Sequence, residues 1–247
     1  DGSNWFSYGT GVGEIGEQIG AITTLPNGDL IVGGLFTTAG GVPALNVARW
    51  DGTAWSNLGA GTDGTDPYGY VGGLTTLANG DVIACGYFNI AGGIEANRVA
   101  RWNGTEWSAL GSGMSGGPTQ TATQLPSGDL IVGGLYNKAG GTPAKNIARW
   151  NGTSWSALGT GPDAFVYDIM NLPNGDVIVA GQFTTIGGIP ANNIARWDGT
   201  SWSTFGVGLG VEPATIGSVH AVTRLNNGDI VVGGFFQYAG GVQANNI

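Results

Sequence analysis

Few side chains in this sequence have types and spacings that could support catalysis or metal binding. Among 247 residues there is one histidine, His220, and one cysteine, Cys85. A single imidazole cannot build a multi-histidine metal centre, and a single cysteine forms neither an internal disulfide nor a cysteine-based zinc cluster. The sequence has no serine–histidine–aspartate pattern, no HExxH motif and no phosphate-binding loop. We therefore expect a protein that is not an enzyme and binds no cofactor or metal.

The elements that must position His220 belong to an internal repeat. A Gly-Asp dipeptide recurs at intervals of 47 to 53 residues. In the first four copies a tryptophan follows the aspartate by 21 residues, and a second tryptophan comes five residues later. Such constancy indicates repeat architecture. The marker aspartates are Asp29, Asp81, Asp129, Asp176 and Asp229.

Each copy has the pattern of four strands joined by tight turns. The first strand ("GAITTLP") alternates and reaches an Asn-Gly-Asp turn, and the second is the β-branched run "DLIVGGLF". The third and fourth, "NVARW" and "TAWSNLG", flank an Asp-Gly or Asn-Gly turn. Two-residue turns of this type are strong hairpin signals, and no segment has a helical period. The sequence therefore predicts an all-β protein.

Four-stranded units repeated around a circle are typical of a β-propeller, although such a period also fits a stacked solenoid. The propeller is favoured because the two ends complement each other. Ile247 stands where a third strand begins, and Trp5 stands where the second tryptophan of a repeat belongs. We expect residues 1–247 to form one domain, an all-β, five-bladed β-propeller of four-stranded antiparallel blades, closed by pairing of the N- and C-terminal strands. An excerpt of a longer chain or of a larger propeller is the alternative.

The repeat resembles the kelch type of β-propeller repeat. The segments "LIVGGLF" and "NVARWDGTAWSNLG" carry the resemblance, with a glycine pair ending one strand and spaced aromatic residues on the next two. They are also similar to propeller repeats of fungal cortical-marker proteins and bacterial surface proteins. The resemblance implies a propeller fold, with two departures. Kelch rings commonly have six or seven blades, and the kelch repeat usually has tyrosine where this sequence has Trp50, Trp102, Trp150 and Trp197.

Two repeated sets of side chains are expected to build the scaffold. The tryptophan pair of each copy, such as Trp50 and Trp55, falls on one face of a hairpin and should pack between blades. The arginine before the first tryptophan points to the other face, beside the marker aspartate, which predicts an ion pair inside each blade. The expected pairs are Asp29 with Arg49, Asp81 with Arg101, Asp129 with Arg149, and Asp176 with Arg196.

The first strand of each copy carries polar positions that differ between copies. Nine residues before the marker aspartate stand Gly20, Gly72, Gln120, Tyr167 and His220, and five residues before it stand Thr24, Thr76, Gln124, Asn171 and Arg224. Function tends to lie where a regular scaffold becomes irregular, so we expect a ligand at the face that carries the connectors of variable length. The expected ligand-binding residues are His220, Arg224, Tyr167, Asp168, Asn171 and Gln124. A water-filled channel without a ligand is the alternative.

Composition limits the partners. The net charge is −9 with only eight basic residues, which argues against binding to a nucleic-acid backbone. No apolar run reaches ~20 residues, so no membrane insertion is expected. An acidic, lysine-poor surface fits an extracellular or cell-surface protein. We expect a non-enzymatic binding module that recognises a carbohydrate or a protein at the connector face. The alternatives are a structural or engineered repeat scaffold within a larger surface protein, and a hydrolase or lyase that uses the His220 region.

Overall fold

The computed structural model describes residues 7–13, 17–63, 69–210 and 217–247. The described residues form strands and turns and no helix, which confirms the all-β prediction. The chain divides into two compact units, unit 1 (Asp1–Gly113) and unit 2 (Met114–Ile247), and each is described by itself. The described residues contain no helix that could cross a membrane.

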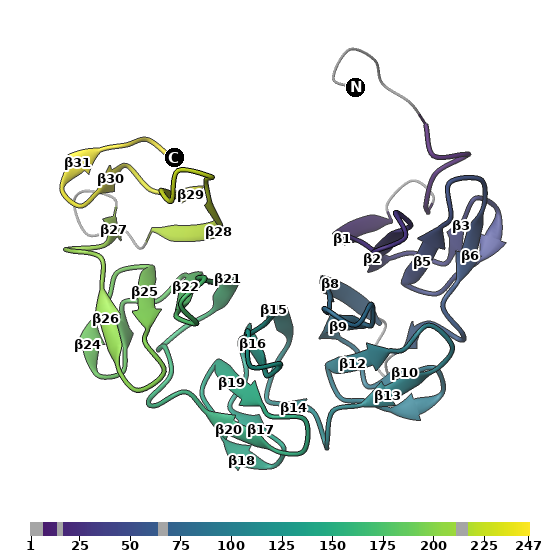
Figure 1. The fold of residues 1–247 in the computed structure, drawn as a ribbon, viewed down its shortest axis with the longest axis horizontal. Helices are drawn as coiled ribbons and strands as arrows, with labels where there is room; N and C mark the ends of the chain where they lie inside the picture. Colours follow the sequence, from purple (N-terminus) through teal and green to yellow (C-terminus); the bar gives the residue numbers. More distant parts are fainter. Residues whose placement is uncertain (1–6, 14–16, 64–68, 211–216) are drawn as a thin grey trace. The chain divides into compact units, whose positions relative to one another are not determined.

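Unit 1 contains two four-stranded antiparallel sheets, which we call blades (Figure 1). In each blade the four main strands of one repeat follow one another across the sheet, with the first strand at one edge and the fourth at the other. The strands are β1 (Gln18–Thr24), β2 (Leu30–Leu35), β5 (Val47–Trp50) and β6 (Trp55–Asn57) in the first blade, and β8 (Tyr70–Thr76), β9 (Val82–Tyr87), β12 (Val99–Trp102) and β13 (Trp107–Ala109) in the second.

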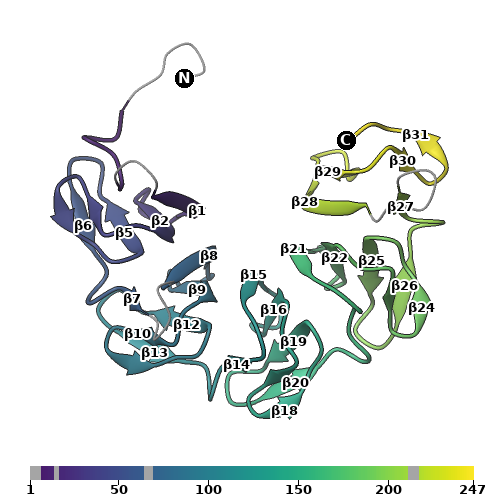
Figure 2. The same cartoon turned by 180° about the vertical axis from the view of Figure 1, so that it is seen from behind.

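The main strands of unit 2 form two further four-stranded blades and, in the fifth repeat, a sheet of two strands (Figure 2). The strands are β15 (Thr119–Gln124), β16 (Leu130–Gly134), β19 (Ile147–Trp150) and β20 (Trp155–Ala157), then β21 (Val166–Asn171), β22 (Val177–Gly181), β25 (Ile194–Trp197) and β26 (Trp202–Thr204), and last β28 (Ser218–Arg224) and β29 (Ile230–Phe235). The fifth repeat thus forms two main strands where four were predicted. Its Ile247 aligns with Val47, the first residue of a third strand.

Among the described residues, strands of two residues each form five small antiparallel sheets beside the blades, three with three strands and two with two strands. In unit 1 they are β3 (Thr38–Ala39), β4 (Val42–Pro43), β7 (Thr62–Asp63), β10 (Ile90–Ala91) and β11 (Ile94–Glu95). In unit 2 they are β14 (Met114–Ser115), β17 (Lys138–Ala139), β18 (Thr142–Pro143), β23 (Thr185–Ile186), β24 (Ile189–Pro190), β27 (Leu209–Gly210), β30 (Tyr238–Ala239) and β31 (Val242–Gln243).

An asparagine with a left-handed backbone holds the loop before the third strand. Asn46 (φ 62°) accepts a hydrogen bond from the backbone N–H of Phe36 at 3.1 Å, and its amide donates to the carbonyl of Thr62 at 2.9 Å. Asparagine tolerates this conformation better than most residues. The second repeat has Arg98 (φ 66°) at the same place. Its guanidinium donates to the side chain of Asn89 at 2.8 Å.

Contacts between neighbouring blades explain the glycine pair and the tryptophans. A Cβ on Gly33 would lie only 2.5 Å from Cγ1 of Val71, because the first strand of the second blade packs closely on β2. The indole N–H of Trp107 donates to the carbonyl of Leu58 at 2.8 Å, which joins the two blades of unit 1. In unit 2, Trp202 donates in the same way to Leu158 at 3.1 Å. The tryptophans therefore pack between blades, as the sequence predicted.

All four predicted aspartate–arginine ion pairs are present. In each, the arginine Nε donates to the aspartate Oδ2 at 2.5 to 2.7 Å, and Nη2 contacts the same oxygen. The arginine side chains are 42–45% exposed, whereas the aspartate side chains are 8–14% exposed. In three blades an asparagine amide also reaches this oxygen, as Asn27 does for Asp29 at 2.8 Å. Each pair therefore links the third strand to the turn before the second strand, with the arginine on the solvent side.

The predicted closure between the two ends is not seen in the described residues. Trp5, the proposed partner of the last strand, lies outside them, and Ile247 belongs to no strand. Within unit 1, however, Tyr8 behaves like the end of a fourth strand. Its carbonyl accepts the indole N–H of Trp55 at 2.9 Å, and its ring meets Trp50 edge-on with 5.9 Å between centroids. Leu58 plays the corresponding part for Trp107.

Candidate functional site

The first strand of every repeat contains a β-bulge at the same position. The register with the second strand shifts between Ile19 and Ala21 in β1, and at the matching places in β8, β15, β21 and β28. A bulge leaves its extra residue outside the ladder and re-aims that side chain. The five extra residues are Gly20, Gly72, Gln120, Tyr167 and His220. A position that differs between the repeats is therefore also the position that the backbone turns out of the sheet.

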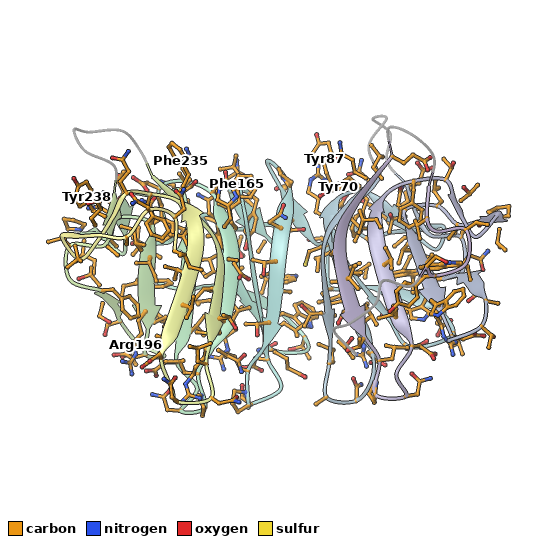
Figure 3. The ribbon with its side chains drawn as sticks, turned by 90° about the horizontal axis from the view of Figure 1, so that it is seen from above. Tyr70, Tyr87, Phe165, Arg196, Phe235 and Tyr238 are labelled. Atoms are coloured by element: carbon orange, nitrogen blue, oxygen red, sulfur yellow. The ribbon has the colours of Figure 1, made fainter. Side chains whose placement is uncertain are left out.

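The bulge of the first repeat has no room for a side chain. A Cβ on Gly20 would lie 2.6 Å from the carbonyl oxygen of Val71 and would also clash with the hydroxyl of Tyr70. Tyr70 and Tyr87 lie opposite each other on β8 and β9, and Figure 3 shows both at one edge of this unit. The guanidinium of Arg98 lies 5.0 Å from the centre of the Tyr87 ring.

In unit 2 the bulge residues form part of a stack of three rings. Phe165 and Tyr167 stack with 4.7 Å between ring centroids and 17° between planes. Tyr167 and His220 come from neighbouring repeats and stack at 4.7 Å and 26°. The stack lies at the end of β21 and β28 that the connectors enter, which we call the connector face of unit 2. Figure 3 shows Phe165 and Phe235 at this edge and Arg196 at the opposite edge.

Two hydrogen bonds fix the polar tips of the stack. The Tyr167 hydroxyl donates to the amide oxygen of Gln182 at 3.3 Å. The Nε2 atom of His220 lies 2.8 Å from the hydroxyl of Ser218, which is 8% exposed. These contacts, together with the stacking, hold the rings in one orientation before any ligand arrives.

Asp168 joins the strands beneath the stack. Its Oδ1 accepts the N–H of Ile169 and its Oδ2 accepts the N–H of Val222 on β28, both at 2.8 Å. Burial raises the pKa of this carboxyl, against the effect of the hydrogen bonds from Val222, Ile169 and Thr121. Both oxygens are therefore engaged with the scaffold, and Asp168 positions β28 against β21 beneath the Tyr167–His220 contact.

The structure separates the predicted site into two groups. Tyr167, Asp168 and His220 lie at the connector face. Arg224 is the last residue of β28 and pairs with Ile230 beside the hairpin turn. Four residues of strand separate Arg224 from His220, a distance of about 13 Å at 3.3 Å per residue. His220 and Arg224 therefore lie toward different ends of β28, because positions nine and five residues before the marker aspartate are separated along the strand. Ligand binding by the predicted residues stays a prediction.

Asn171 and Gln124 lie at the turn end with Arg224. The hydroxyl of Thr123 donates to Oδ1 of Asn171 at 3.0 Å, which joins β15 to β21. The Gln124 amide donates to the carbonyl of Gly128 at 3.3 Å. The side chains of Thr23 and Thr76 make the corresponding contact in unit 1 at 2.9 Å. Asn171 and Gln124 therefore have contacts that support the scaffold.

Three residues at the connector face of unit 2 were not predicted from the sequence: Phe165, Ser218 and Phe235. Phe165 and Ser218 stand eleven residues before their marker aspartates, and Phe235 stands six residues after Asp229. Phe235 is 61% exposed and lies directly opposite Ser218 in the ladder. These residues could have been found from the variation between repeats, both eleven residues before and six residues after the marker aspartate. The position of Phe235, for example, holds leucine, tyrosine, glutamine or phenylalanine. Apolar variation within a strand is easily taken for core packing.

A family model described as a β-propeller domain of unknown function (DUF5122) matches residues 25–50 and 172–197. Both matches run from the residue before the inner hairpin turn to the first tryptophan of a repeat. They establish the β-propeller character of the repeat but do not confirm the kelch type. No curated protein matches the sequence.

Solved structures show the same fold at low identity. The extracellular domain of BT4673, a proposed one-component system from B. thetaiotaomicron, has a TM-score of 0.60 at 10% identity over 91% of this chain, which spans 26% of that chain. A proposed gluconolactonase has a TM-score of 0.55 at 15% identity over 96% of this chain and 83% of its own. PorZ, a surface component of the type-IX secretion system of Porphyromonas gingivalis, has a TM-score of 0.53 at 13% identity over 88% of this chain and 31% of its own. The chain therefore has a β-propeller fold, and two of these three neighbours are extracellular or surface proteins.

Proposed function

We propose that this chain is a non-enzymatic binding module of an extracellular or cell-surface protein, and that it recognises a carbohydrate or a protein at the connector face of unit 2. The observation that carries the proposal is the stack of Phe165, Tyr167 and His220, which is built from residues that the repeats do not share. Aromatic side chains held on a rigid scaffold provide contact area at a low cost in conformational entropy. The extracellular and surface neighbours support the proposed location.

The proposal includes a closed, five-bladed ring of kelch-like type. Asn246 accepts the N–H of Phe236 at 3.1 Å, as Asn46 accepts that of Phe36, so the fifth repeat follows the common pattern up to its third strand. A Cβ on Gly240 would meet nothing within 4 Å, whereas one on Gly40 would contact Trp55. By the spacing of the repeat, Trp5 is the tryptophan that would pack beside Gly240 in a closed ring.

The contacts of the polar groups favour binding over hydrolysis. Both oxygens of Asp168 accept backbone N–H groups, and the Ser218 hydroxyl near His220 is buried. The competing function is a hydrolase or lyase, for which the 2.8 Å contact between Ser218 and His220 is the relevant observation. A purely structural scaffold is the remaining alternative.

A glycan array combined with a screen of extracellular protein ligands tests the proposal. We expect a ligand for the unaltered protein, loss of its binding in His220→Ala, and retained binding in Arg224→Ala, which changes the same strand at its other end. Equal binding by both variants would contradict the proposed face. Absence of any ligand, with turnover of a chromogenic ester or glycoside that Ser218→Ala abolishes, would support the hydrolase instead.

A further inference from the structure

The three stacked rings at the connector face do not offer equal surfaces to a ligand. Tyr167 is the middle ring, with Phe165 on one face and His220 on the other, each 4.7 Å away. Both of its faces are therefore covered, and its hydroxyl is bound to Gln182. Phe165 is half-buried, whereas His220 is exposed. Within the described residues of unit 2, the exposed ring face is the side of the imidazole that points away from Tyr167.

The surroundings of His220 combine an apolar side chain with uncharged polar groups. Ser218 contacts Nε2 of the imidazole, which leaves Nδ1 as the second polar atom of that ring. Phe235 stands opposite Ser218 in the β28–β29 ladder and is the most exposed phenylalanine among the described residues. Gln182 and Ser218, whose side chains form hydrogen bonds with Tyr167 and His220, carry no charge.

These groups suit a ligand that has one flat apolar face and several hydroxyl groups at its edge. A pyranose ring has this form, since its axial C–H groups make one face apolar while its hydroxyls can donate and accept hydrogen bonds. A net charge of −9 makes the protein repel an anionic ligand at long range. A protein partner would need a larger buried core, on the order of 800 Å² from each side.

We infer that the outer face of His220 is a subsite for a neutral sugar ring, with Ser218 and Phe235 at the same end of the β28–β29 ladder, and that Tyr167 is a positioning residue which holds the imidazole. This inference rests on the proposed function and names its ligand class. The sugar extends the existing stack by one ring, so the imidazole needs no reorientation on binding. Phe235 adds a second apolar contact at the same end of the sheet.

The single histidine provides a direct test, because the protein has only one set of imidazole NMR signals. We would titrate the unaltered protein with neutral methyl glycosides and oligosaccharides, and with glucuronic acid as the charged comparison. Binding would be followed on the sugar by saturation transfer and on the protein by the His220 Hε1 and Hδ2 resonances. We expect a neutral sugar to move both resonances, Phe235→Ala to weaken binding at least fivefold, and Arg224→Ala to leave it unchanged.

The experiment distinguishes failure of the His220 sugar subsite from failure of the proposed binding function. A sugar that gives saturation transfer without moving the His220 signals would overturn the subsite and leave the carbohydrate-binding module standing. Tighter binding of glucuronic acid than of neutral sugars would overturn the ligand class. If no sugar gives saturation transfer, the subsite is wrong, and the screen of protein ligands then decides the proposed function. Tyr167→Leu separates positioning from contact, since it should broaden or shift the His220 signals before any sugar is added.

Discussion

The Asp168 carboxylate accepts the backbone N–H of Val222 at 2.8 Å and so joins the first strands of two successive repeats. Asp168 is the residue next to Tyr167 on β21, and Val222 lies two residues after His220 on β28. Asp168, which the sequence suggested as a ligand-binding residue, thus links two neighbouring blades through its carboxylate. It sets the register in which the two rings meet.

Replacing Asp168 by alanine should destabilise unit 2 and disturb the stack. The N–H groups of Val222 and Ile169 would lose their acceptor, a loss of about 2 kcal/mol for buried donors. Thermal unfolding would give the stability change, and the His220 resonances would report the stack. Asp163→Ala is the matched control, because Asp163 also accepts backbone N–H groups, from Thr184 and Thr185, but at an exposed position. A His220 spectrum unchanged by Asp168→Ala would show that the carboxylate does not position the ring.

The ion pairs should contribute unequally in different blades. Arg149→Ala should cost about 1 kcal/mol, because the arginine side chain is 45% exposed and solvent screens such pairs. Arg196→Ala should cost less, since Asn174 still donates to Asp176 at 2.9 Å, whereas the third blade has Ser127 where the others have asparagine. Urea unfolding of the two variants checks the order. Equal costs would mean that the asparagine gives no compensation.

The turn between the third and fourth strands should make the stability of the protein depend on pH in the acid range. Hydrogen bonds, first from the Thr53 side chain and then from the N–H groups of Ala54 and Thr53, lower the pKa of Asp51 to about 2. The folded-state pKa lies below that of the unfolded chain, so the stabilisation is present above pH ~4 and is lost as the pH falls toward ~2. Asn103 occupies the same turn position in the second blade with the same acceptor geometry.

Exchanging these two residues should therefore exchange the pH dependence. Asp51→Asn should flatten the melting temperature between pH 4 and pH 2, and Asn103→Asp should steepen it by a similar amount, with both variants close to the unaltered protein at pH 7. Melting curves at half-unit pH intervals provide the measurement. Parallel curves for all three proteins would show that the turn carboxylate has the same pKa in the folded and unfolded states.

The sequence predicted those features that depend on spacing within one repeat. The Asp29–Arg49 pair follows from strand alternation and a short hairpin, and the packing of Trp107 follows from its constant place in the repeat. The Tyr167–His220 stack could be predicted only as two variable positions, because their contact depends on a bulge and on the distance between blades. The separation of His220 from Arg224 was missed because the predicted site treated one strand as one location.

Two equivalent glycines test whether the proposed ring closes. Gly33→Ala should destabilise the protein by about 1–3 kcal/mol, because the new Cβ would lie 2.5 Å from Cγ1 of the buried Val71 on the next blade. Gly233 holds the same place in the fifth repeat, and a Cβ there meets nothing within 4 Å among the described residues. The residue equivalent to Val71 in the first repeat is Ile19, which is 52% exposed within unit 1. In a closed ring Ile19 would pack on Gly233, so Gly233→Ala should cost as much as Gly33→Ala. Thermal unfolding of both variants gives the comparison, and a Gly233→Ala protein as stable as the unaltered one would contradict closure.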